Sequence, residues 1–311
     1  MAAIEVRGLT KAYGDLVAND DLTFEVERGE IFGYLGPNGA GKTTTIRTLM
    51  GFLAPTAGEA RLLGHDVADE AELVAAKRRV GYLPSDVAFE ETTTGREILD
   101  LHGAIKGDTR RGELLELFEP PLDRPVREYS SGNRQKLGLV QAFMHDPELV
   151  VLDEPTSGLD PLLQQRFNEF VRAERDAGTT VFFSSHVLSE VRRVCDRVGV
   201  IRDGELITVE TVEDLLARSG KVVTARVGSA VDASELPDGV HDLTTTVLDG
   251  AAADVEVSFT YTGDVDALVH ALSDHPLRDL TVAEAPIEDV FLRFYGESDG
   301  TSPTAGGDRD A

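Results

Sequence analysis

The 311-residue chain contains no tryptophan and a single cysteine, and aromatic residues make up only 6% of it. Its core must therefore be built from aliphatic side chains, as is common in α/β folds. The cysteine, Cys195, cannot form an internal disulfide, and we interpret it as a small core residue. Met1–Glu5 has neither the basic nor the apolar part of a secretion signal, so we expect the protein in a reducing cytosol. No apolar run approaches the roughly 18 residues of a membrane span, so membrane association would come through a partner.

Lysine is also scarce, and the charge balance is strongly acidic. The chain has 56 acidic and 30 basic residues, a net charge of −26, and only six of the basic residues are lysines. The electrostatic field of so negative a protein repels the phosphate backbones of nucleic acids, so we expect no nucleic-acid partner. An acidic, lysine-poor surface also suggests adaptation to high salt, where self-repulsion is screened; an ordinary acidic protein is the alternative. Loss of the fold at low ionic strength would support adaptation, and full stability there would refute it.

Apolar segments of strand length alternate with segments of helical periodicity, which predicts an α/β fold with a parallel sheet. The predicted strands occupy residues 30–35, 79–83, 149–152 and 180–184. The predicted helical segments occupy residues 42–50, most of 94–145, a stretch from Pro161 that Gly178 ends, and residues 187–195. Thr94 and Glu97 have the spacing of a capping box, and Pro161 suits the first position of a helix capped by Asp160.

A domain boundary is expected near Ser219–Gly220. Beyond it, short strands around 222–227, 244–248 and 255–261 and two amphipathic helices predict a small α+β domain over residues 220–296. The helices carry their apolar residues at helical spacing, in the segments 265–272 and 287–294. The acidic tail, residues 297–311, is rich in Gly, Ser, Thr and Asp and is expected to be disordered.

The segment Gly36–Thr43, GPNGAGKT, has the spacing of a phosphate-binding loop and stands between a predicted strand and a predicted helix. Glycines allow successive backbone N–H groups to surround a phosphate, and the helix N-terminus adds its positive end. Lys42 would neutralise phosphate oxygens, and the Thr43 hydroxyl would ligate Mg²⁺.

Two carboxylates follow the apolar strand 149–152. Asp153 and Glu154 would lie at the carboxyl edge of a parallel sheet, where open α/β folds bind ligands. We expect Asp153 to hold Mg²⁺ through water and Glu154 to polarise the water that attacks the γ-phosphate. Without the phosphate loop upstream, both would be interpreted as helix caps.

These motifs occur in an order that resembles the ATP-binding subunit of an ABC transporter. The matching segments are Tyr13 (the aromatic that stacks on adenine), Gly36–Thr43 (Walker A), Tyr129–Gln135 (a variant of LSGGQ), Leu149–Glu154 (Walker B), Ser157–Asp160 (the D-loop) and His186 (the switch histidine). The resemblance covers residues 1 to about 215. It implies a P-loop ABC-type ATPase core over residues 1–219, with an antiparallel β subdomain and a helical subdomain at about 86–145.

The resemblance also implies the site residues, with ATP and Mg²⁺ as the ligands. The nucleotide-binding set is Tyr13, Gly36, Asn38, Gly39, Ala40, Gly41, Lys42, Thr43, Thr44, Ser130, Ser131, Gly132, Asn133 and Asp160. The catalytic set is Lys42, Glu154 and His186, and the metal set is Thr43 and Asp153. In this family the LSGGQ segment faces the γ-phosphate of the opposite protomer, so a chain with one cassette is expected to form a head-to-tail homodimer.

The sequence departs from the family pattern at two places. After the strand ending at Leu83 the family carries Gln, whereas this chain has Pro84-Ser85-Asp86. Ser85 acting through water, or Asp86, are the two candidates to replace that side chain. In the signature segment, Ser131 replaces one of the two glycines and Asn133 replaces Gln, and we expect both changes to be tolerated.

The function implied by the resemblance is ATP hydrolysis that powers a membrane transporter, in the style of drug, antibiotic and lipid exporters. The partner would be an integral membrane permease, docked on the helical region, which would keep this chain on the inner face of the cell membrane. The alternatives are a soluble ABC-type ATPase acting on nucleic acid or ribosomes, and a nucleotide-binding regulator without turnover. The cargo is not encoded in this chain, because selectivity belongs to the permease.

Overall fold

The computed structural model describes residues 2–228, 231–232, 235–248, 254–273 and 275–284. It divides into two compact units, residues 1–212 and 213–311. The division falls at the start of α8 (Val212–Ser219), a few residues before the boundary proposed from the sequence. None of the helices in the described part of the chain combines the length and apolar composition of a membrane span.

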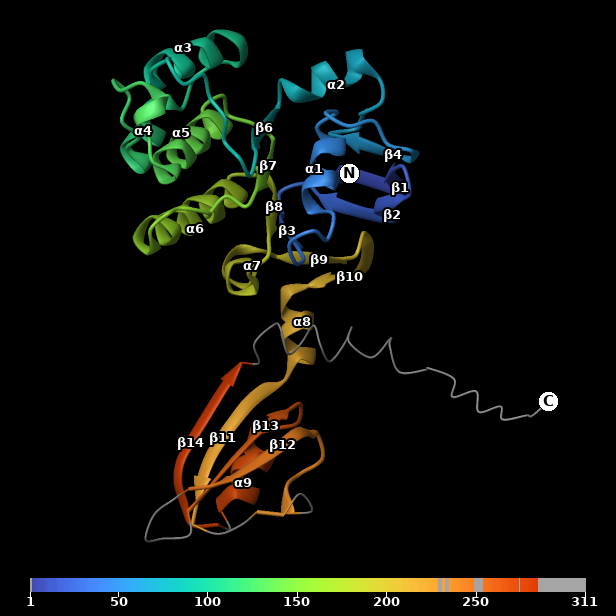
Figure 1. The fold of residues 1–311 in the computed structure, drawn as a ribbon, viewed down its shortest axis with the longest axis vertical. Coiled ribbons are helices and arrows are strands. Elements are labelled where there is room, and N and C mark those ends of the chain that lie inside the picture. Colours follow the sequence, from blue (N-terminus) through green and yellow to red (C-terminus); the bar gives the residue numbers. More distant parts are fainter. Residues whose placement is uncertain (1, 229–230, 233–234, 249–253, 274, 285–311) are drawn as a thin grey trace, which may run out of the picture. The chain divides into compact units, whose positions relative to one another are not determined.

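A six-stranded sheet is the centre of the first unit, and five of its strands are parallel (Figure 1). Its order is β10 (Glu205–Thr211), β9 (Arg197–Arg202), β3 (Ile31–Leu35), β8 (Thr180–Ser185), β7 (Leu149–Asp153) and β6 (Val80–Leu83). Every residue of β3, β7 and β8 is buried, as the uninterrupted apolar runs predict for strands covered on both faces. A hairpin turn at Asp203–Gly204 joins β9 to the antiparallel edge strand β10.

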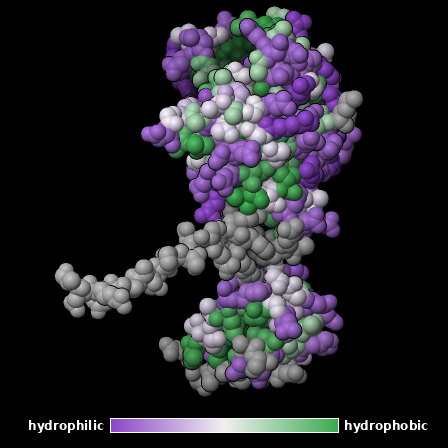
Figure 2. Space-filling model, turned by 90° about the vertical axis from the view of Figure 1, so that its right-hand side faces the viewer, coloured by the Kyte–Doolittle hydropathy of each residue, from purple (hydrophilic) through white to green (hydrophobic). Residues whose placement is uncertain are grey.

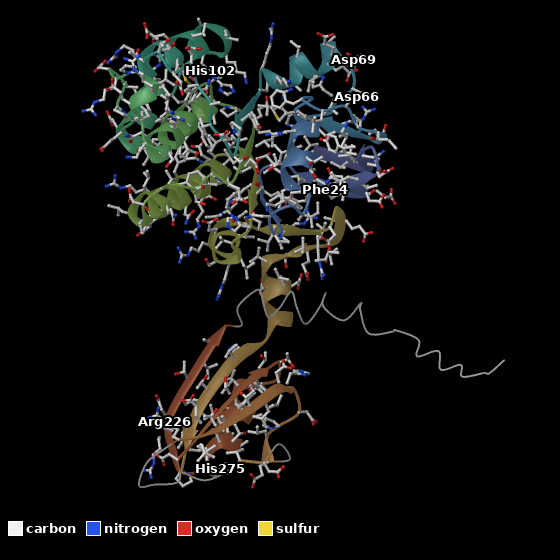
Figure 3. The ribbon with its side chains drawn as sticks, in the orientation of Figure 1. Phe24, Asp66, Asp69, His102, Arg226 and His275 are labelled. Carbon is white, nitrogen blue, oxygen red and sulfur yellow. The ribbon has the colours of Figure 1, made fainter. Side chains whose placement is uncertain are left out.

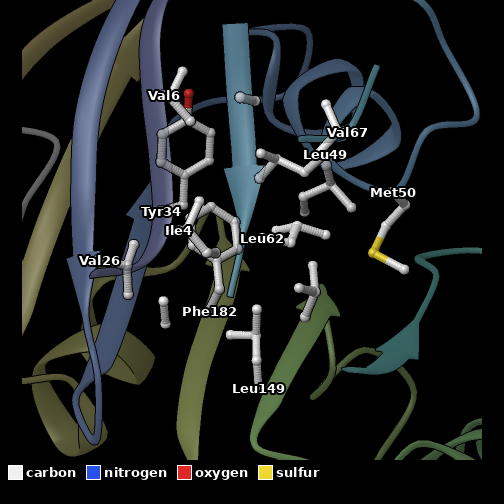
Figure 4. Close-up of a cluster of buried hydrophobic side chains, with 14 of the residues drawn as sticks. Ile4, Val6, Val26, Tyr34, Leu49, Met50, Leu62, Val67, Leu149 and Phe182 are labelled. Carbon is white, nitrogen blue, oxygen red and sulfur yellow. The ribbon is translucent and has the colours of Figure 1, made fainter. Parts of the chain in front are cut away.

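An antiparallel sheet and helix α1 (Lys42–Leu49) cover one face of this central sheet. The strands in sheet order are β2 (Leu16–Glu27), β1 (Ala2–Tyr13), β4 (Ala57–Leu62) and β5 (His65–Asp66). Their apolar side chains meet those of the central sheet in one cluster, in which the rings of Tyr34 and Phe182 lie 5.3 Å apart (Figure 4). The Tyr34 hydroxyl lies 3.2 Å from Thr45 Oγ1, which ties this core to the helix after the phosphate loop.

Helices α6 (Pro161–Asp176) and α7 (Leu188–Val194) cover the other face (Figure 1). Helix α6 begins as predicted, with Pro161 in its first turn and the Asp160 side chain accepting from Leu163 N at 3.0 Å. Cys195, directly after α7, is buried, which confirms its interpretation as a core residue.

The predicted helical region contains α3 (Gly95–Lys106), α4 (Arg111–Phe118), the short 3₁₀ segment Val126–Glu128 and α5 (Ser131–Phe143). The capping box of Thr94 and Glu97 forms at the start of α3. Before α4, Arg110 makes a two-pronged ion pair with the buried Glu174 of α6, which fastens the helical region to the core. A further helix, α2 (Glu70–Lys77), capped by Asp69, was not predicted.

The second unit is an antiparallel sheet with one helix against it. The strand order is β12 (Val240–Val247), β13 (Val255–Tyr261), β11 (Lys221–Val227) and β14 (Leu277–Glu284), and α9 (Val265–Ser273) buries Leu268 and Leu272 in the core. This confirms three strands and a helix of the predicted α+β domain; β14 was not predicted. The predicted helix at 287–294 and the tail 297–311 lie outside the described residues.

Candidate active site

The phosphate loop lies between β3 and α1, where the sequence places it. Gly41 adopts φ +107°, and a Cβ there would lie 2.5 Å from Ala18 O, so both its conformation and its surroundings require glycine. The Asn19 amide donates to Gly41 O at 3.2 Å and to Thr45 Oγ1 at 3.1 Å, which holds the loop at the start of the helix. Free backbone N–H groups at a helix N-terminus form an anion site.

A pocket of about 320 Å³ opens over this loop. Its lining combines the loop, the first residues of α1, and side chains from two strand ends: Ala18, Pro37, Asn38, Gly39, Gly41, Lys42, Thr43, Thr44, Ser85 and Glu154. The structure thus brings Ser85 to the same pocket as Thr43 and Glu154. Asp86, the other candidate for the missing glutamine, is exposed and is not among the lining residues.

The ammonium group of Lys42 lies inside the phosphate loop, and the residue is only 6% exposed. Its Nζ donates to Gly36 O at 2.6 Å and to Pro37 O at 3.1 Å, and it lies 3.5 Å from Glu154 Oε1. A cation held by two carbonyls and one carboxylate is placed to exchange that carboxylate for a phosphate oxygen.

Glu154 connects Lys42 to His186. Nδ1 of His186 lies 2.9 Å from Glu154 Oε2, so the ring donates a hydrogen bond to the carboxylate from that nitrogen. Glu154 adopts φ +53°, which is uncommon for a residue with a side chain, and its backbone N–H donates to Ser184 Oγ at 3.1 Å. This strained turn directs the carboxylate into the pocket, as expected of a functional position.

Asp153 is buried at the end of β7, between two hydroxyl groups. Thr43 Oγ1 donates to Asp153 Oδ2 at 3.0 Å, and Ser184 Oγ donates to Oδ1 at 2.6 Å. The chemistry of this donor set, a carboxylate and a hydroxyl beside a phosphate site, fits Mg²⁺, which prefers oxygen ligands. Thr43 and Asp153 are thus brought together as the sequence predicted.

The signature residues lie against their own D-loop instead of in the pocket. Ser130 caps α5 by accepting from Asn133 N at 3.3 Å, and a Cβ on Gly132 would lie 2.7 Å from Gly158 O. From the next turn of α5, Gln135 Nε2 donates to Pro155 O at 2.8 Å. None of Ser130–Asn133 lines the pocket of its own chain.

Two other predicted nucleotide contacts lie away from the phosphate loop. Tyr13 ends β1 with 46% of its surface exposed, and Lys11 Nζ lies 5.0 Å from its ring centroid. Asp160 is exposed and caps α6. Neither residue lines the pocket, so the pocket corresponds to the phosphate part of a nucleotide site.

The sequence reasoning missed two residues that hold the site in place, Ser184 and Asn19. Ser184 fixes both Asp153 and the backbone of Glu154, and Asn19 fixes the phosphate loop from β2. A hydroxyl residue at the end of an otherwise apolar strand is the one signal that could have indicated Ser184. Asn19 is fully buried, but it lies in a strand, β2, that contains several other polar residues. The sequence therefore gives no signal that singles it out.

Comparison with known proteins identifies the family. The ABC transporter profile matches residues 19–157. An uncharacterized ABC transporter ATP-binding protein of Synechocystis is 34% identical, over 89% of this chain and 78% of the relative. The daunorubicin resistance ATP-binding protein DrrA3 of Streptomyces coeruleorubidus is 35% identical, over 95% and 96% of the two chains. The chain belongs to the ABC transporter ATP-binding proteins.

Solved structures agree with this assignment. The ATP-binding subunit of an ABC transporter superposes with a TM-score of 0.64 at 31% identity, over 70% of this chain and 92% of the other. A dimeric ATP-binding cassette bound to ADP and phosphate superposes with a TM-score of 0.62 at 23% identity, over 67% and 98%, and supports the fold. This ABC ATP-binding protein is therefore an ATPase subunit with the P-loop ABC fold that was predicted. The alternative of a soluble ATPase acting on nucleic acid or ribosomes finds no support in these relatives.

Proposed function

We propose that this ABC ATP-binding protein is the ATPase subunit of an exporter, working as a homodimer on an integral membrane permease at the inner face of the cell membrane. Support for export comes from relatives named for drug resistance, including the daunorubicin protein above and the bacitracin transport ATP-binding protein BcrA of Bacillus licheniformis, which is 32% identical over 94% of this chain. The acidic surface favours a protein partner over nucleic acid and fits a high-salt cytosol.

The triphosphate of ATP would bind over the phosphate loop. Backbone N–H groups from Gly39 to Thr44, with Gly36, Asn38 and Ala40 shaping the loop, would surround the phosphates, and Lys42 would neutralise their oxygens. The adenine would extend out of the pocket toward Tyr13, whose exposed ring offers a stacking face.

The observation that carries the catalytic assignment is the position of Glu154 between Lys42 and His186, at 3.5 and 2.9 Å. When phosphate oxygens replace Glu154 as the partner of Lys42, the Glu154 carboxylate becomes free to accept a proton from the attacking water. The water oxygen forms a bond to the γ-phosphorus as the bond to the β–γ bridging oxygen breaks, which yields ADP and phosphate. His186 orients the carboxylate during this step.

Magnesium would be held by Thr43 and Asp153, with Ser85 facing it through water. When bound, the cation would neutralise charge on the β- and γ-phosphate oxygens. Hydrogen bonds from Ser184 and Thr43 hold the Asp153 carboxylate next to Thr43, which lines the pocket.

The second copy of the chain would complete each site. Ser130, Ser131, Gly132 and Asn133 stand at the N-terminus of α5, outside their own pocket, so their hydroxyl and N–H groups are available to the γ-phosphate of the partner subunit. Asp160, the last residue of the D-loop and the cap of α6, would lie at the same interface.

The test is the ATPase activity of Glu154→Gln, with Glu116→Gln on the exposed surface of α4 as the matched control. We expect Glu154→Gln to retain ATP binding and to lose at least roughly 100-fold in turnover, because the base is removed while the pocket keeps its shape. The control should match wild type. Equal turnover of wild type and Glu154→Gln would refute the catalytic assignment, and purification with ribosomes instead of a polytopic membrane protein would refute transport.

A further inference from the structure

The carboxylate of Glu190, in the first turn of α7, accepts a hydrogen bond on each of its oxygens. Thr156 Oγ1 donates to Oε1 at 2.7 Å, and Ser185 Oγ donates to Oε2 at 2.7 Å. Thr156 follows Glu154, the proposed base, by two residues, and Ser185 directly precedes His186. Glu190 therefore bridges the segment that carries Glu154 to the segment that carries His186.

The two hydroxyl groups that donate to Glu190 are closed off from solvent. Ser185 is 0% exposed and Thr156 is 4% exposed. Figure 2 shows many hydrophilic side chains on the surface of the first unit, where water can satisfy polar groups, but these two residues need an internal acceptor. Without the Glu190 carboxylate, both buried hydroxyl groups would lose that acceptor, and nothing would hold their segments together at this point.

The turn that carries His186 is fixed on both sides. Val187 N donates to Ser185 Oγ at 2.9 Å, and the same hydroxyl group donates to Glu190. The backbone of this turn is also tied to the start of the phosphate loop, because Gly36 N donates to Ser185 O at 3.2 Å. The side chain of His186 itself is 49% exposed, so its direction depends on how the turn is held.

The other end of the bridge lies at a well-anchored place. The segment 155–156 receives a side chain from each of three helices. Gln135 of α5 donates to Pro155 O at 2.8 Å, Gln164 of α6 donates to Thr156 O at 3.4 Å, and Glu190 of α7 accepts from the Thr156 hydroxyl. Thr156 is therefore a fixed point, and it holds one Glu190 oxygen in place while the other oxygen holds the turn before α7.

The consequence for the reaction concerns the bond between His186 and Glu154. His186 can orient the carboxylate only while its Nδ1 stays within hydrogen-bond distance of Glu154 Oε2, at 2.9 Å in this structure. A displacement of a catalytic group by about 1 Å can cost roughly 100-fold in rate. Glu190, Ser185 and Thr156 do not line the phosphate pocket, so their influence on the reaction passes through this pair and not through contacts to ATP.

We propose that Glu190 is a positioning residue for ATP hydrolysis, which holds Ser185 against Thr156 and thereby keeps the imidazole of His186 directed at Glu154. This inference rests on the proposed function, because it requires that His186 orients the Glu154 carboxylate. A carboxylate in the first turn of a helix also stabilises that helix through its dipole. That role alone would change the melting temperature without acting selectively on the step that needs His186.

The first test measures steady-state ATPase kinetics of full-length variants that each remove one part of the bridge. Glu190→Gln replaces one accepting oxygen by an NH₂ group, which cannot accept a hydrogen bond. We expect kcat to fall about tenfold while KM for ATP stays unchanged. Ser185→Ala should have the same effect, and Thr156→Val should also lower kcat. Ser189→Ala, which removes an exposed hydroxyl from α7, is the matched control and should behave like wild type.

The second test is a double-mutant cycle with His186→Ala, followed by single-turnover hydrolysis of radiolabelled ATP so that slow rates are resolved. If Glu190 acts through His186, Glu190→Gln should have no further effect once the imidazole is absent. The control cycle uses His102→Gln, in α3 at the opposite end of the first unit from α7 (Figure 1, Figure 3). In that background Glu190→Gln should keep its full effect, because distant sites act independently.

Three outcomes would overturn the proposal. They are a wild-type kcat in Glu190→Gln, a raised KM with an unchanged kcat, or the same loss of rate in the His186→Ala background as in wild type. If melting curves show that Glu190→Gln is poorly folded, Ser185→Ala is taken through the same cycle and decides.

The two proposals can fail separately. Turnover of His186→Ala at the wild-type rate would refute the orienting role of His186 and this inference with it. Slow turnover of His186→Ala and Glu154→Gln, together with normal turnover of Glu190→Gln, would refute only the role of Glu190. The proposed ATPase mechanism would then stand.

Discussion

The Ser184 hydroxyl donates to Asp153 Oδ1 at 2.6 Å while the Thr43 hydroxyl donates to Oδ2 at 3.0 Å. The carboxylate at the end of β7 is therefore held by one donor from the neighbouring strand and one from the phosphate loop. Hydrogen bonds to an ionised acceptor are stronger than neutral ones, so the pair fixes the orientation of the carboxylate. Ser184 is a positioning residue for the proposed metal ligand.

Removing this hydroxyl should weaken magnesium binding more than catalysis. We expect Ser184→Ala to raise the Mg²⁺ concentration for half-maximal ATPase activity about tenfold, with kcat nearly retained at saturating Mg²⁺. A Mg²⁺ titration of turnover checks this, and Ser184→Thr, which keeps the hydroxyl, should rescue it. A lower melting temperature with an unchanged Mg²⁺ requirement would indicate a purely structural role.

The segment after β6 offers a direct comparison between Ser85 and Asp86. Because Ser85 lines the pocket and Asp86 does not, Ser85→Ala should raise the Mg²⁺ requirement for ATP binding about fivefold, the effect of one lost hydrogen bond. Asp86→Asn should leave it unchanged. Binding of a fluorescent ATP analogue, titrated with Mg²⁺ in the Glu154→Gln background, measures both. The opposite ranking would assign the missing glutamine's role to Asp86.

The contact between Gly132 and Gly158 predicts a defect that is specific to assembly. A Cβ at position 132 would lie 2.7 Å from Gly158 O, so Gly132→Ala must move the start of α5 away from the D-loop. Because this segment is outside its own pocket, ATP binding by a single subunit should be unchanged. Turnover should fall at least roughly tenfold, since the second copy is proposed to use this segment.

The control for that change is Gly112→Ala on α4, where an added Cβ meets nothing within 4 Å. It should retain full turnover and gain some helix stability. Loss of ATP binding in Gly132→Ala would show that the segment serves its own subunit, contrary to the proposed arrangement.

Local signals made much of the fold and site predictable. Uninterrupted apolar runs identified the buried parallel strands, the capping box identified the start of α3, and the phosphate-loop spacing placed Lys42 and Thr43 in the pocket. Each of these signals depends on residues that are close in sequence, so the interactions that produce the structure are contained in one short segment.

The features that escaped prediction depend on distant pairing. Strand β14 is an exposed edge strand whose position is set by its ladder with Lys221–Val227, which lies fifty or more residues earlier in the chain. Ser184 acquires its role only when β8 lies beside β7 in register, with Asp153 opposite it. Asn19 contacts Gly41 only because β2 lies beside the phosphate loop in the folded chain. No periodicity or local motif encodes these neighbours.

The pair His102 and His145 predicts how stability changes with pH. Their ring centroids lie 5.6 Å apart, and burial, with the charge of Lys106, lowers the pKa of each to about 4 from an ordinary value of 6.5. Between about pH 6.5 and 4 the unfolded chain therefore binds more protons than the folded one at these sites. Their contribution to the free energy of unfolding is present above pH 6.5 and is lost as the pH falls through this window.

Replacing both rings should flatten that dependence. We expect the melting temperature of wild type to fall between pH 7.5 and 5.0 by about 2–4 °C more than that of His102→Gln/His145→Gln, a modest effect because both rings are only half buried. Melting curves at the two pH values give the fall in melting temperature for each protein. Subtracting one fall from the other cancels the contribution of the carboxylates, which the two proteins share. His270→Gln, on the exposed surface of α9, should behave like wild type. If the double variant loses as much stability on acidification as wild type does, the buried histidines do not carry the pH dependence.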